Sequence, residues 1–439
     1  MKIKRIISNI FLILPILSLC ACSNGIKDPY VLPDISGEIV ENIDSLLENK
    51  QYTIKEVETQ KMIEGRILGY GNGLKAGDTV EKSDKTVVEV AKRMSTATNI
   101  DNGLVKYCNR ISITTGPNGV NAELLTAAGQ GGTDLGIPFT LADGRIMLLF
   151  GDTFSADKMG GFWNSNFMAI TTDTDLTDGL NFDSVVTNQI GMIKPFAQGK
   201  HEDGSKDDPE REITKIPTGG ISVNGNNYIF YMSIHFWVPW SVAYNQCLKA
   251  TDDTFTEWAE VEGLKWTKDE LYNAGQVYPF LNPKEPDYVY FTSIPGGRKG
   301  GAILFRVLKE NFEEKDEYEY LVGPSTYLKG SAGINSLNES PYYIIEPGVS
   351  EPSIMYSKYL NKWIYSTIKG GGLMFLLADN VEGPYEERYL AINGDAPFIN
   401  YYGGFVHQAF TDTDGRRIYI QLSEYNPIYN TSLVEIVLE

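Results

Sequence analysis

The sequence predicts an all-β fold, a five-bladed β-propeller preceded by an N-terminal extension. Two patterns predict it: short apolar runs bounded by turn residues, and a composition rich in Gly and Tyr. The five apolar runs are residues 144–150, 227–233, 288–293, 362–368 and 416–422. They recur at uneven spacing, which suits propeller blades decorated with loops of different lengths.

Each run follows a short turn or surface loop and precedes another strand candidate, as expected for blades built from antiparallel strands. The chain contains 43 Gly and 26 Tyr, and aromatic residues reach 12%. Aromatic residues favour strands, and Gly suits the turns between them. Exposed aromatic rings also suit contact with sugars.

The N-terminus is typical of an export signal. Lys2, Lys4 and Arg5 precede an apolar run, 6–19, that is too short to span a membrane. Cys22 follows a small residue and begins a polar stretch, as in bacterial lipoproteins, so we expect Cys22 to carry a lipid. This predicts an exported lipoprotein of the cell envelope, at the outer membrane and facing the periplasm or the surface. An ordinary signal peptide in which Cys22 has no role stays open.

We therefore divide the chain into three parts. Residues 1–21 form the lipoprotein signal peptide, 22–110 a tether and accessory segment, and 111–439 the catalytic propeller. The middle part contains helix-compatible stretches, 39–47 and 86–94, with few strand alternations.

The net charge of the chain is −19, and removal of residues 1–21 takes away three positive charges and leaves −22. This balance disfavours nucleic acid as a partner. Cys108 and Cys247 remain in the mature chain, where one disulfide and two buried thiols are both compatible with the sequence. We expect a monomer without a cofactor; no Cys/His cluster suggests zinc, and an ion in the propeller channel stays open.

Two aspartates flank one predicted hairpin. Asp134 lies in a glycine-flanked stretch just before a strand, and Asp152 directly follows the apolar run 144–150. An acid at each end of a hairpin can reach the same end of a blade. Hydrolysis of a glycosidic bond needs such a pair of carboxyl groups. Tight turns that use aspartate beside glycine are the structural alternative for each residue alone.

Glu351 is a third candidate because it enters an apolar strand predicted to be innermost in its blade. A buried carboxylate without a partner is costly, so Glu351 must face the axial channel or be compensated. An ion pair with a neighbouring Arg stays open beside a catalytic role.

Further side chains have the chemistry of sugar contacts. We predict substrate-binding roles for Trp163, Asn164, Asn166, His235, His407 and Tyr402. Packed side chains, or histidines bonded to backbone carbonyls, are the structural alternatives. His201 lies in a charged loop, and we expect it to be solvated.

The sequence resembles the domain-of-unknown-function 4185 family, which includes the endo-D-arabinanases of glycoside hydrolase family 183. The resemblance spans residues 111–439 and excludes the extension. The matching segments are 132–136, 143–145, 149–153, 163–166, 172–175, 217–220, 295–298, Glu351 with the strand after it, and 402–407.

The resemblance implies that Asp134 and Asp152 are the essential pair of an inverting enzyme, with the assignment of acid and base open. The resemblance also implies a role for Glu351, as a third carboxylate that either serves as the acid or positions the substrate. The expected partner is the polysaccharide D-arabinan, of arabinogalactan or lipoarabinomannan type, cleaved at internal α-D-arabinofuranosyl linkages. An exo-acting or different furanosidase and a non-catalytic glycan-binding surface propeller stay open.

Overall fold

The computed structural model describes most of the chain after residue 102. The described ranges are 103–202, 207–208, 210–238, 240–298, 300–369, 372–392, 401–425 and 429–439, with the short strands β1 (Thr79–Glu81), β2 (Val87–Glu89) and β3 (Met94–Ser95) before them. The signal peptide, Cys22 and the helix-compatible stretch 39–47 lie outside the described residues. No helix in the described ranges is long and apolar enough to cross a membrane.

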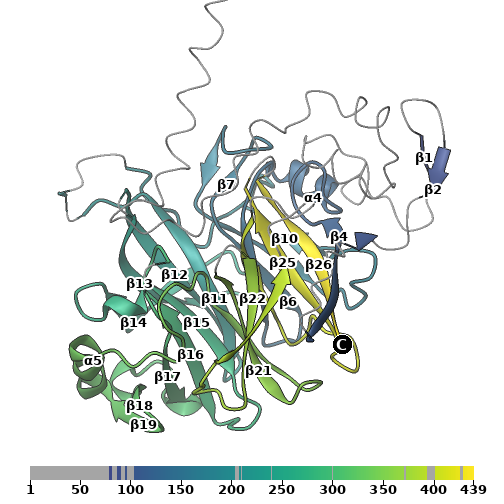
Figure 1. Ribbon diagram of the computed structural model, residues 1–439. Coiled ribbons are helices and arrows are strands. Elements are labelled where there is room, and N and C mark those ends of the chain that lie inside the picture. The colour runs from purple at the N-terminus through teal and green to yellow at the C-terminus, as the bar shows by residue number, and fades with distance from the viewer. Residues whose placement is uncertain are drawn as a thin grey trace, which may run out of the picture.

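Five antiparallel sheets are arranged around one axis as the blades of a propeller (Figure 1). From the innermost strand outwards, blade one contains β5 (Leu135–Thr140), β6 (Ile146–Phe150), β9 (Phe167–Thr171) and β10 (Ser184–Val185). Blade two contains β11 (Thr214–Val223), β12 (Asn226–Trp237), β13 (Trp240–Ala250) and β14 (Trp258–Thr267). Blade three contains β15 (Gln276–Leu281), β16 (Tyr288–Ile294), β17 (Ile303–Leu308), β18 (Glu319–Gly323) and β19 (Thr326–Lys329).

The last two blades complete the circle. Blade four contains β20 (Ser353–Ser357), β21 (Lys362–Lys369), β22 (Gly372–Ala378) and β23 (Glu387–Ile392). Blade five contains β24 (Tyr401–Phe405), β25 (Arg417–Glu424), β26 (Asn430–Leu438), β4 (Val105–Ile113) and β3. Smaller elements are the hairpin β7 (Thr153–Phe154) and β8 (Trp163–Asn164), the helices α4 (Ala122–Ala127) and α5 (Gly330–Glu339), and the 3-10 turns η4 (Tyr272–Ala274), η5 (Lys309–Asn311) and η6 (Lys315–Glu317).

The propeller predicted from the sequence is confirmed, and the five apolar runs have one common place in it. They correspond to β6, β12, β16, β21 and β25, the second strand of each blade. A second strand is covered on both faces by neighbouring blades and on both edges by other strands, so its sequence is a nearly continuous apolar run.

The innermost strands pack against one another in a closed ring, β5 to β11 to β15 to β20 to β24 and back to β5. Each contributes a buried side chain to one shared core, namely Leu135, Ile216, Tyr278, Ile354 and Phe405. This core fixes the relative positions of the strand ends, where the candidate site lies.

The two ends of the described chain meet in blade five, where β26 pairs with β4 (Figure 1). Arg110 and Glu424 form a buried ion pair across this blade, and Asn109 donates a hydrogen bond of 2.9 Å to Glu435. β4 starts at Val105 and so extends across the boundary placed at residue 111 in the sequence. Its polar residues, which are paired inside the blade, hide the strand pattern.

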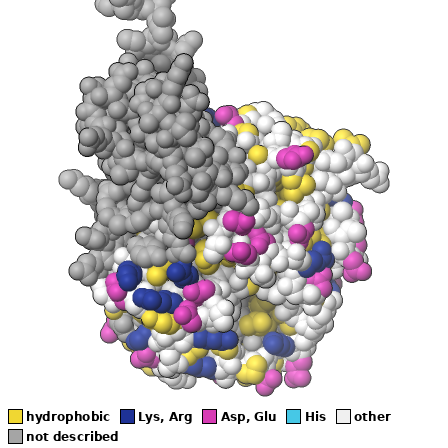
Figure 2. Space-filling view, turned by 90° about the vertical axis from the view of Figure 1, so that its right-hand side faces the viewer, with side chains coloured by type: hydrophobic (Ala, Val, Ile, Leu, Met, Phe, Trp, Pro, Cys, Tyr) yellow, Lys and Arg dark blue, Asp and Glu magenta, His cyan; other side chains and the backbone are white. Residues whose placement is uncertain are grey.

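The stretch 86–94, which the sequence makes helix-compatible, contains strand where it is described: β2 lies within it, and β3 begins at its last residue and pairs with β4. At these residues the structure has strand in place of helix. Cys108 and Cys247 are buried thiols in blades five and two, and they do not form the disulfide that the sequence left open. On the face shown in Figure 2, acidic and basic side chains are interspersed with apolar ones over the described surface.

Candidate active site

The innermost strands of several blades begin beside acidic or aromatic side chains. Asp134 directly precedes β5, Glu212 lies two residues before β11, and Glu351 lies two residues before β20. Tyr402 is the second residue of β24. Because these strands all start at the same end of the ring, their first residues converge there, as the contacts below demonstrate.

Asp134 is buried, with 7% of its surface exposed. Its Oδ2 accepts hydrogen bonds from the hydroxyls of Tyr402 and Tyr429, the latter at 2.8 Å. Its Oδ1 is also buried and has no hydrogen-bond partner within the described part of the chain. Burial raises the pKa of Asp134 to about 6; the two tyrosine hydrogen bonds oppose this shift, and the negative charge of Glu351 adds to it.

The backbone around Asp134 is closely packed. The Gly151 amide donates a hydrogen bond of 3.2 Å to the Asp134 carbonyl oxygen. A Cβ atom at position 151 would lie 2.3 Å from Asp134 Oδ1, so only glycine lets the carboxyl group lie here. Leu135 adopts a left-handed backbone (φ 69°), a strained conformation that is common at functional sites.

Asp152 lies next to Gly151 and is equally buried. Its Oδ1 accepts hydrogen bonds from Trp163 Nε1 at 2.9 Å and from Thr214 Oγ1 at 2.6 Å. Burial raises the pKa of Asp152 to about 7, and the negative charge of Asp134 raises it further, whereas the two hydrogen bonds lower it. The two aspartates therefore interact electrostatically, and near neutral pH the pair holds about one proton.

Glu351 forms an ion pair with Arg298, whose Nη2 lies 2.9 Å from Oε1. Burial raises the pKa of Glu351, but the charge of Arg298, followed by hydrogen bonds from the Glu351 backbone, Arg298 and Ser350, outweighs burial and leaves the pKa below its usual value. The Arg298 guanidinium also lies over the Tyr402 ring, 5.5 Å from its centroid. Of the two alternatives for Glu351, the structure contains the ion pair, which keeps this carboxylate charged.

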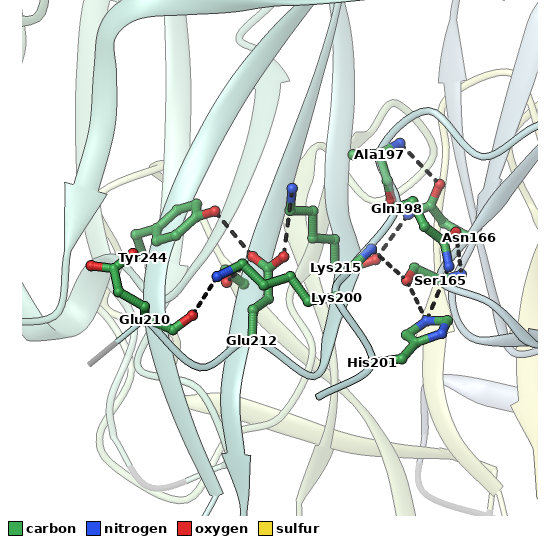
Figure 3. A network of polar contacts seen from close by, with 12 residues as sticks. Ser165, Asn166, Ala197, Gln198, Lys200, His201, Glu210, Glu212, Lys215 and Tyr244 are labelled. Carbon is green, nitrogen blue, oxygen red and sulfur yellow. Dashed lines mark hydrogen bonds and ion pairs between the residues drawn. The ribbon is translucent and has the colours of Figure 1, made fainter. Parts of the chain in front are cut away.

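Trp163 and His201 stack face to face, with ring centroids 3.8 Å apart and an angle of 5° between the ring planes. His201 Nε2 lies 3.0 Å from Ser165 Oγ and 3.2 Å from the Gln198 amide nitrogen (Figure 3). The prediction of a solvated His201 is therefore wrong, because the loop folds back onto β8. The Trp163 face that His201 covers is closed to a sugar, and the indole instead orients Asp152.

The two asparagines beside Trp163 differ in their surroundings. Asn164 is half-buried in β8, next to Trp163. Asn166 is fully buried: its amide donates to the Ala197 and Lys215 carbonyls at 2.6 and 2.9 Å and accepts from the Phe196 amide at 2.9 Å (Figure 3). A substrate-binding role for Asn166 is therefore wrong, since backbone groups occupy its amide.

The two predicted histidines lie at different ends of the propeller. His235 follows Ile234, which pairs with Thr214, so it lies at the end of the acid pair; its Nδ1 donates to the Arg211 carbonyl oxygen at 2.9 Å. His407 follows the far end of β24 and lies 3.5 Å from Thr140 Oγ1, at the end of the six-residue strand β5.

A strand of that length spans roughly 20 Å, so His407 does not reach substrate at the Asp134 end of β5. Burial lowers the pKa of His407 to about 4. The predicted substrate contact of His407 is wrong. Tyr402 lies at the start of β24, at the end of the propeller that holds the acids, whereas His407 comes after the end of the same strand and so lies at the opposite end.

Sequence reasoning missed Glu212 in blade two. It is buried, and its Oε2 accepts hydrogen bonds from Ser233 at 2.5 Å and Tyr244 at 3.1 Å, while Lys215 Nζ lies 3.6 Å from Oε1 (Figure 3). The sequence pattern could have predicted Glu212, because it precedes an apolar innermost strand just as Asp134 and Glu351 do.

Chemically, the arrangement contains two buried carboxyl groups that interact electrostatically and whose pKa values are raised toward neutral pH. Asp134 and Asp152 share about one proton, and Trp163, Thr214 and two tyrosine hydroxyls hold the carboxyl groups in place. Within the described ranges, no group of three or more His, Cys, Asp or Glu side chains could hold a metal ion.

Comparison with known proteins gives one family and few named relatives. A family model described as "Domain of unknown function (DUF4185)" matches residues 122–435. Notoamide biosynthesis cluster protein J of Aspergillus sp. (strain MF297-2) is 25% identical over 323 residues, which are 69% of this chain and 82% of that protein. Notoamide biosynthesis cluster protein J' of Aspergillus versicolor is 24% identical over 314 residues, 68% of this chain and 82% of that protein.

Among solved structures, a candidate hydrolase from Bacteroides ovatus ATCC 8483 superposes with a TM-score of 0.53. Its sequence is 11% identical, and the match covers 75% of this chain and 90% of that one. At this level of identity the similarity shows a shared fold.

Proposed function

Because the chain belongs to the DUF4185 family and carries two neighbouring buried aspartates at one end of its propeller, we propose that it is a glycoside hydrolase that cleaves internal α-D-arabinofuranosyl linkages of D-arabinan with inversion. The observation that carries the proposal is the pair of carboxyl groups whose pKa values rise to about 6 at Asp134 and about 7 at Asp152. Inverting glycosidases need one protonated and one ionised carboxyl group at the same pH.

In this mechanism Asp152 is the general acid. Its raised pKa keeps it protonated near neutral pH, and Trp163 and Thr214 orient it through Oδ1. As the glycosidic bond breaks, Asp152 transfers its proton to the leaving oxygen and becomes a carboxylate.

Asp134 is the general base. Two tyrosine hydroxyls stabilise its ionised form at Oδ2, and in this mechanism we assign the attacking water to Oδ1. Asp134 takes a proton from that water while the water oxygen attacks the anomeric carbon on the face opposite the leaving group. The product then has the inverted configuration.

Glu351 is a positioning residue in this proposal. Arg298 keeps it charged, which suits a hydrogen-bond acceptor for sugar hydroxyls and not a proton donor. Its charge also raises the pKa of Asp134. Tyr402 connects the two carboxylates, since it donates to Asp134 and lies under Arg298.

The experiment that tests the function uses the protein from Ser23 onward with D-arabinan, L-arabinan and a galactan, and separates the products by size over time. A ladder of oligosaccharides from D-arabinan alone is expected. Release of monosaccharide from the start would indicate an exo-acting enzyme, and binding without cleavage of any glycan would indicate a glycan-binding propeller.

Asp134→Asn and Asp152→Asn each preserve the fold and abolish cleavage if the proposal holds. The matched control is Asp143→Asn, because Asp143 lies in the turn between β5 and β6, at the opposite end of the same hairpin, and its side chain is half exposed. Near-normal turnover by either Asp134→Asn or Asp152→Asn contradicts the proposed pair.

We further propose that the protein is an exported lipoprotein, with residues 1–21 removed, Cys22 lipidated and residues 22–110 acting as tether. The pattern of Lys2, the apolar run and Cys22 supports this proposal. Mass spectrometry of the protein from membranes tests it, since a diacylglyceryl adduct on Cys22 is expected and Cys22→Ala removes it. Recovery of wild-type protein without the adduct contradicts it.

A further inference from the structure

A small cavity lies between blades two and three, outside the acid pair. Its volume is about 70 Å³. Side chains of β13, β14 and the segment that leads into β15 line it, chiefly Trp240, Tyr244, Trp266, Lys268 and Tyr272, and the backbone of Gly296 closes one side.

Two contacts connect the cavity with the carboxylates at the end of the propeller. On one side, the hydroxyl of the lining residue Tyr244 donates to Glu212 at 3.1 Å (Figure 3). On the other side, Gly296 lies two residues before Arg298, which binds Glu351. The cavity therefore lies at the same end of the propeller as Asp134 and Asp152, the end at which β11 starts and the β12–β13 hairpin turns.

The cavity contains a hydrogen-bond donor without a protein acceptor. Trp240 Nε1 is buried and makes no hydrogen bond to any described residue. An enclosed N–H group is costly unless a ligand or a water molecule supplies the acceptor. The Trp240 ring itself is fixed by Trp237, with ring centroids 4.8 Å apart.

Two glycines let the neighbouring loop approach this indole closely. A Cβ atom at Gly296 would lie 2.2 Å from Val242 Cγ2, and one at Gly297 would lie 2.7 Å from Trp240 Cδ1. Side chains at these positions would displace the Trp240 ring, so the wall of the cavity depends on both glycines.

The mouth of the cavity offers an aromatic ring to solvent. Tyr272 is 55% exposed, an unusual degree for a large aromatic residue, whereas Trp266 forms a buried floor. Exposed aromatic faces bind the apolar faces of sugar rings. Lys268, also exposed, adds a hydrogen-bond donor beside it.

We propose that this cavity is an outlying subsite for one neutral glycosyl unit of the glycan that the Asp134–Asp152 pair cleaves. The sugar ring lies on Tyr272, and one of its free hydroxyl groups enters the cavity and accepts a hydrogen bond from Trp240 Nε1. The inference rests on the proposed function, and the subsite makes long chains bind more tightly than short ones.

The test measures binding by the Asp152→Asn protein, which prevents turnover, to a linear D-arabino-hexasaccharide and a D-arabino-disaccharide. Trp240→Phe keeps the ring and removes the N–H group. It is expected to weaken hexasaccharide binding by about tenfold, equivalent to about 1.4 kcal/mol, and to affect the disaccharide much less. Tyr272→Ala, at a position where the side chain is 55% exposed, is expected to have the same length-dependent effect.

The matched control is Trp258→Phe on β14, whose Nε1 already donates to the Phe255 carbonyl at 2.9 Å. It should bind both oligosaccharides as the parent protein does. Equal hexasaccharide affinity in the Trp240→Phe, Tyr272→Ala and Trp258→Phe proteins overturns the subsite.

A separate turnover assay of the wild-type protein distinguishes the two proposals. Cleavage of D-arabinan without any effect of Trp240 on the hexasaccharide overturns the subsite and leaves the hydrolase. Binding of the hexasaccharide that depends on Trp240, without cleavage of any glycan, supports the subsite and overturns the hydrolase.

Discussion

Tyr402 donates a hydrogen bond from its hydroxyl to Oδ2 of Asp134, 268 residues away in the chain. Blade five thereby supports a carboxylate of blade one, and the closure of the propeller brings the two residues together. Burial favours the protonated form of Asp134, and a donor that favours the ionised form is what makes a buried aspartate useful as a base.

Tyr402→Phe should therefore raise the pKa of Asp134 and shift the acid limb of the pH–activity profile upward. Hydrogen bonds to charged groups contribute roughly 1.5–3 kcal/mol, so a shift of about one pH unit is expected, with Tyr429 still in place. The measurement is kcat/KM on a defined arabino-oligosaccharide from acid to alkaline pH.

Tyr401→Phe is the matched control for that substitution. The Tyr401 hydroxyl donates to the Ile392 carbonyl oxygen and accepts from the Leu373 amide, both in blade four. This variant should lose some stability and keep the acid limb of the wild-type protein. An unmoved acid limb in Tyr402→Phe would show that Asp134 is not the base.

Wild-type activity should follow a narrow bell-shaped pH profile with its maximum between about 6 and 7. Activity rises as Asp134 loses its proton, near pH 6, and falls as Asp152 loses its own, near pH 7. The two limbs are linked, because the negative charge of Asp134 raises the pKa of Asp152. Activity that stays level from pH 5 to pH 9 would contradict the assignment of these two residues.

The sequence predicted that Asp134 and Asp152 lie at the same end of one blade, because the pattern that indicates it is local. Asp134 and Asp152 flank one hairpin, β5–β6, and the turn residues around them mark where the strands end. The blades were predictable for the same reason, since each second strand is a continuous apolar run.

The supporting contacts were not predictable, because they join distant segments. Tyr429 lies 295 residues from Asp134, and Thr214 lies 62 residues from Asp152. His201 was misinterpreted because its charged neighbours hide a ring that packs on Trp163. A sequence gives the residue types at a strand end, but which blades meet there depends on the closure of the ring.

Arg298→Met should destabilise the protein at neutral pH and less at pH 3. The lowered pKa of Glu351 means that its ion pair contributes stability above the unfolded pKa of 4.5, and this contribution is lost as the pH falls through the lower folded pKa. Removing one partner of an enclosed pair costs roughly 2–3 kcal/mol, somewhat less than for a fully buried pair.

Denaturant unfolding at both pH values measures the Arg298 effect, with Arg145→Met as control. Arg145 pairs with Asp143 on the surface, where both side chains are at least 36% exposed, and such pairs contribute under about 1 kcal/mol. If the two substitutions lower the free energy of unfolding equally at pH 7, the Glu351–Arg298 ion pair stabilises the protein no more than an exposed surface pair does.

Asp152→Asn should make the protein more stable than the wild type above pH 7 while it abolishes turnover. The folded pKa of Asp152, about 7, is raised above its unfolded value of 3.8 by burial first and by the charge of Asp134 second. A raised acid pKa gives stability that is fully present below pH 3.8 and is lost as the pH rises through 7, because ionisation inside the protein is costly.

Asn keeps an oxygen for Trp163 and Thr214 but never ionises. The difference in unfolding free energy should therefore be small at pH 4 and reach on the order of a few kcal/mol at pH 8. Asp143→Asn must behave in the opposite way, since Arg145 lowers the pKa of Asp143, and a gain in Asp152→Asn that does not grow with pH would refute a protonated, buried Asp152.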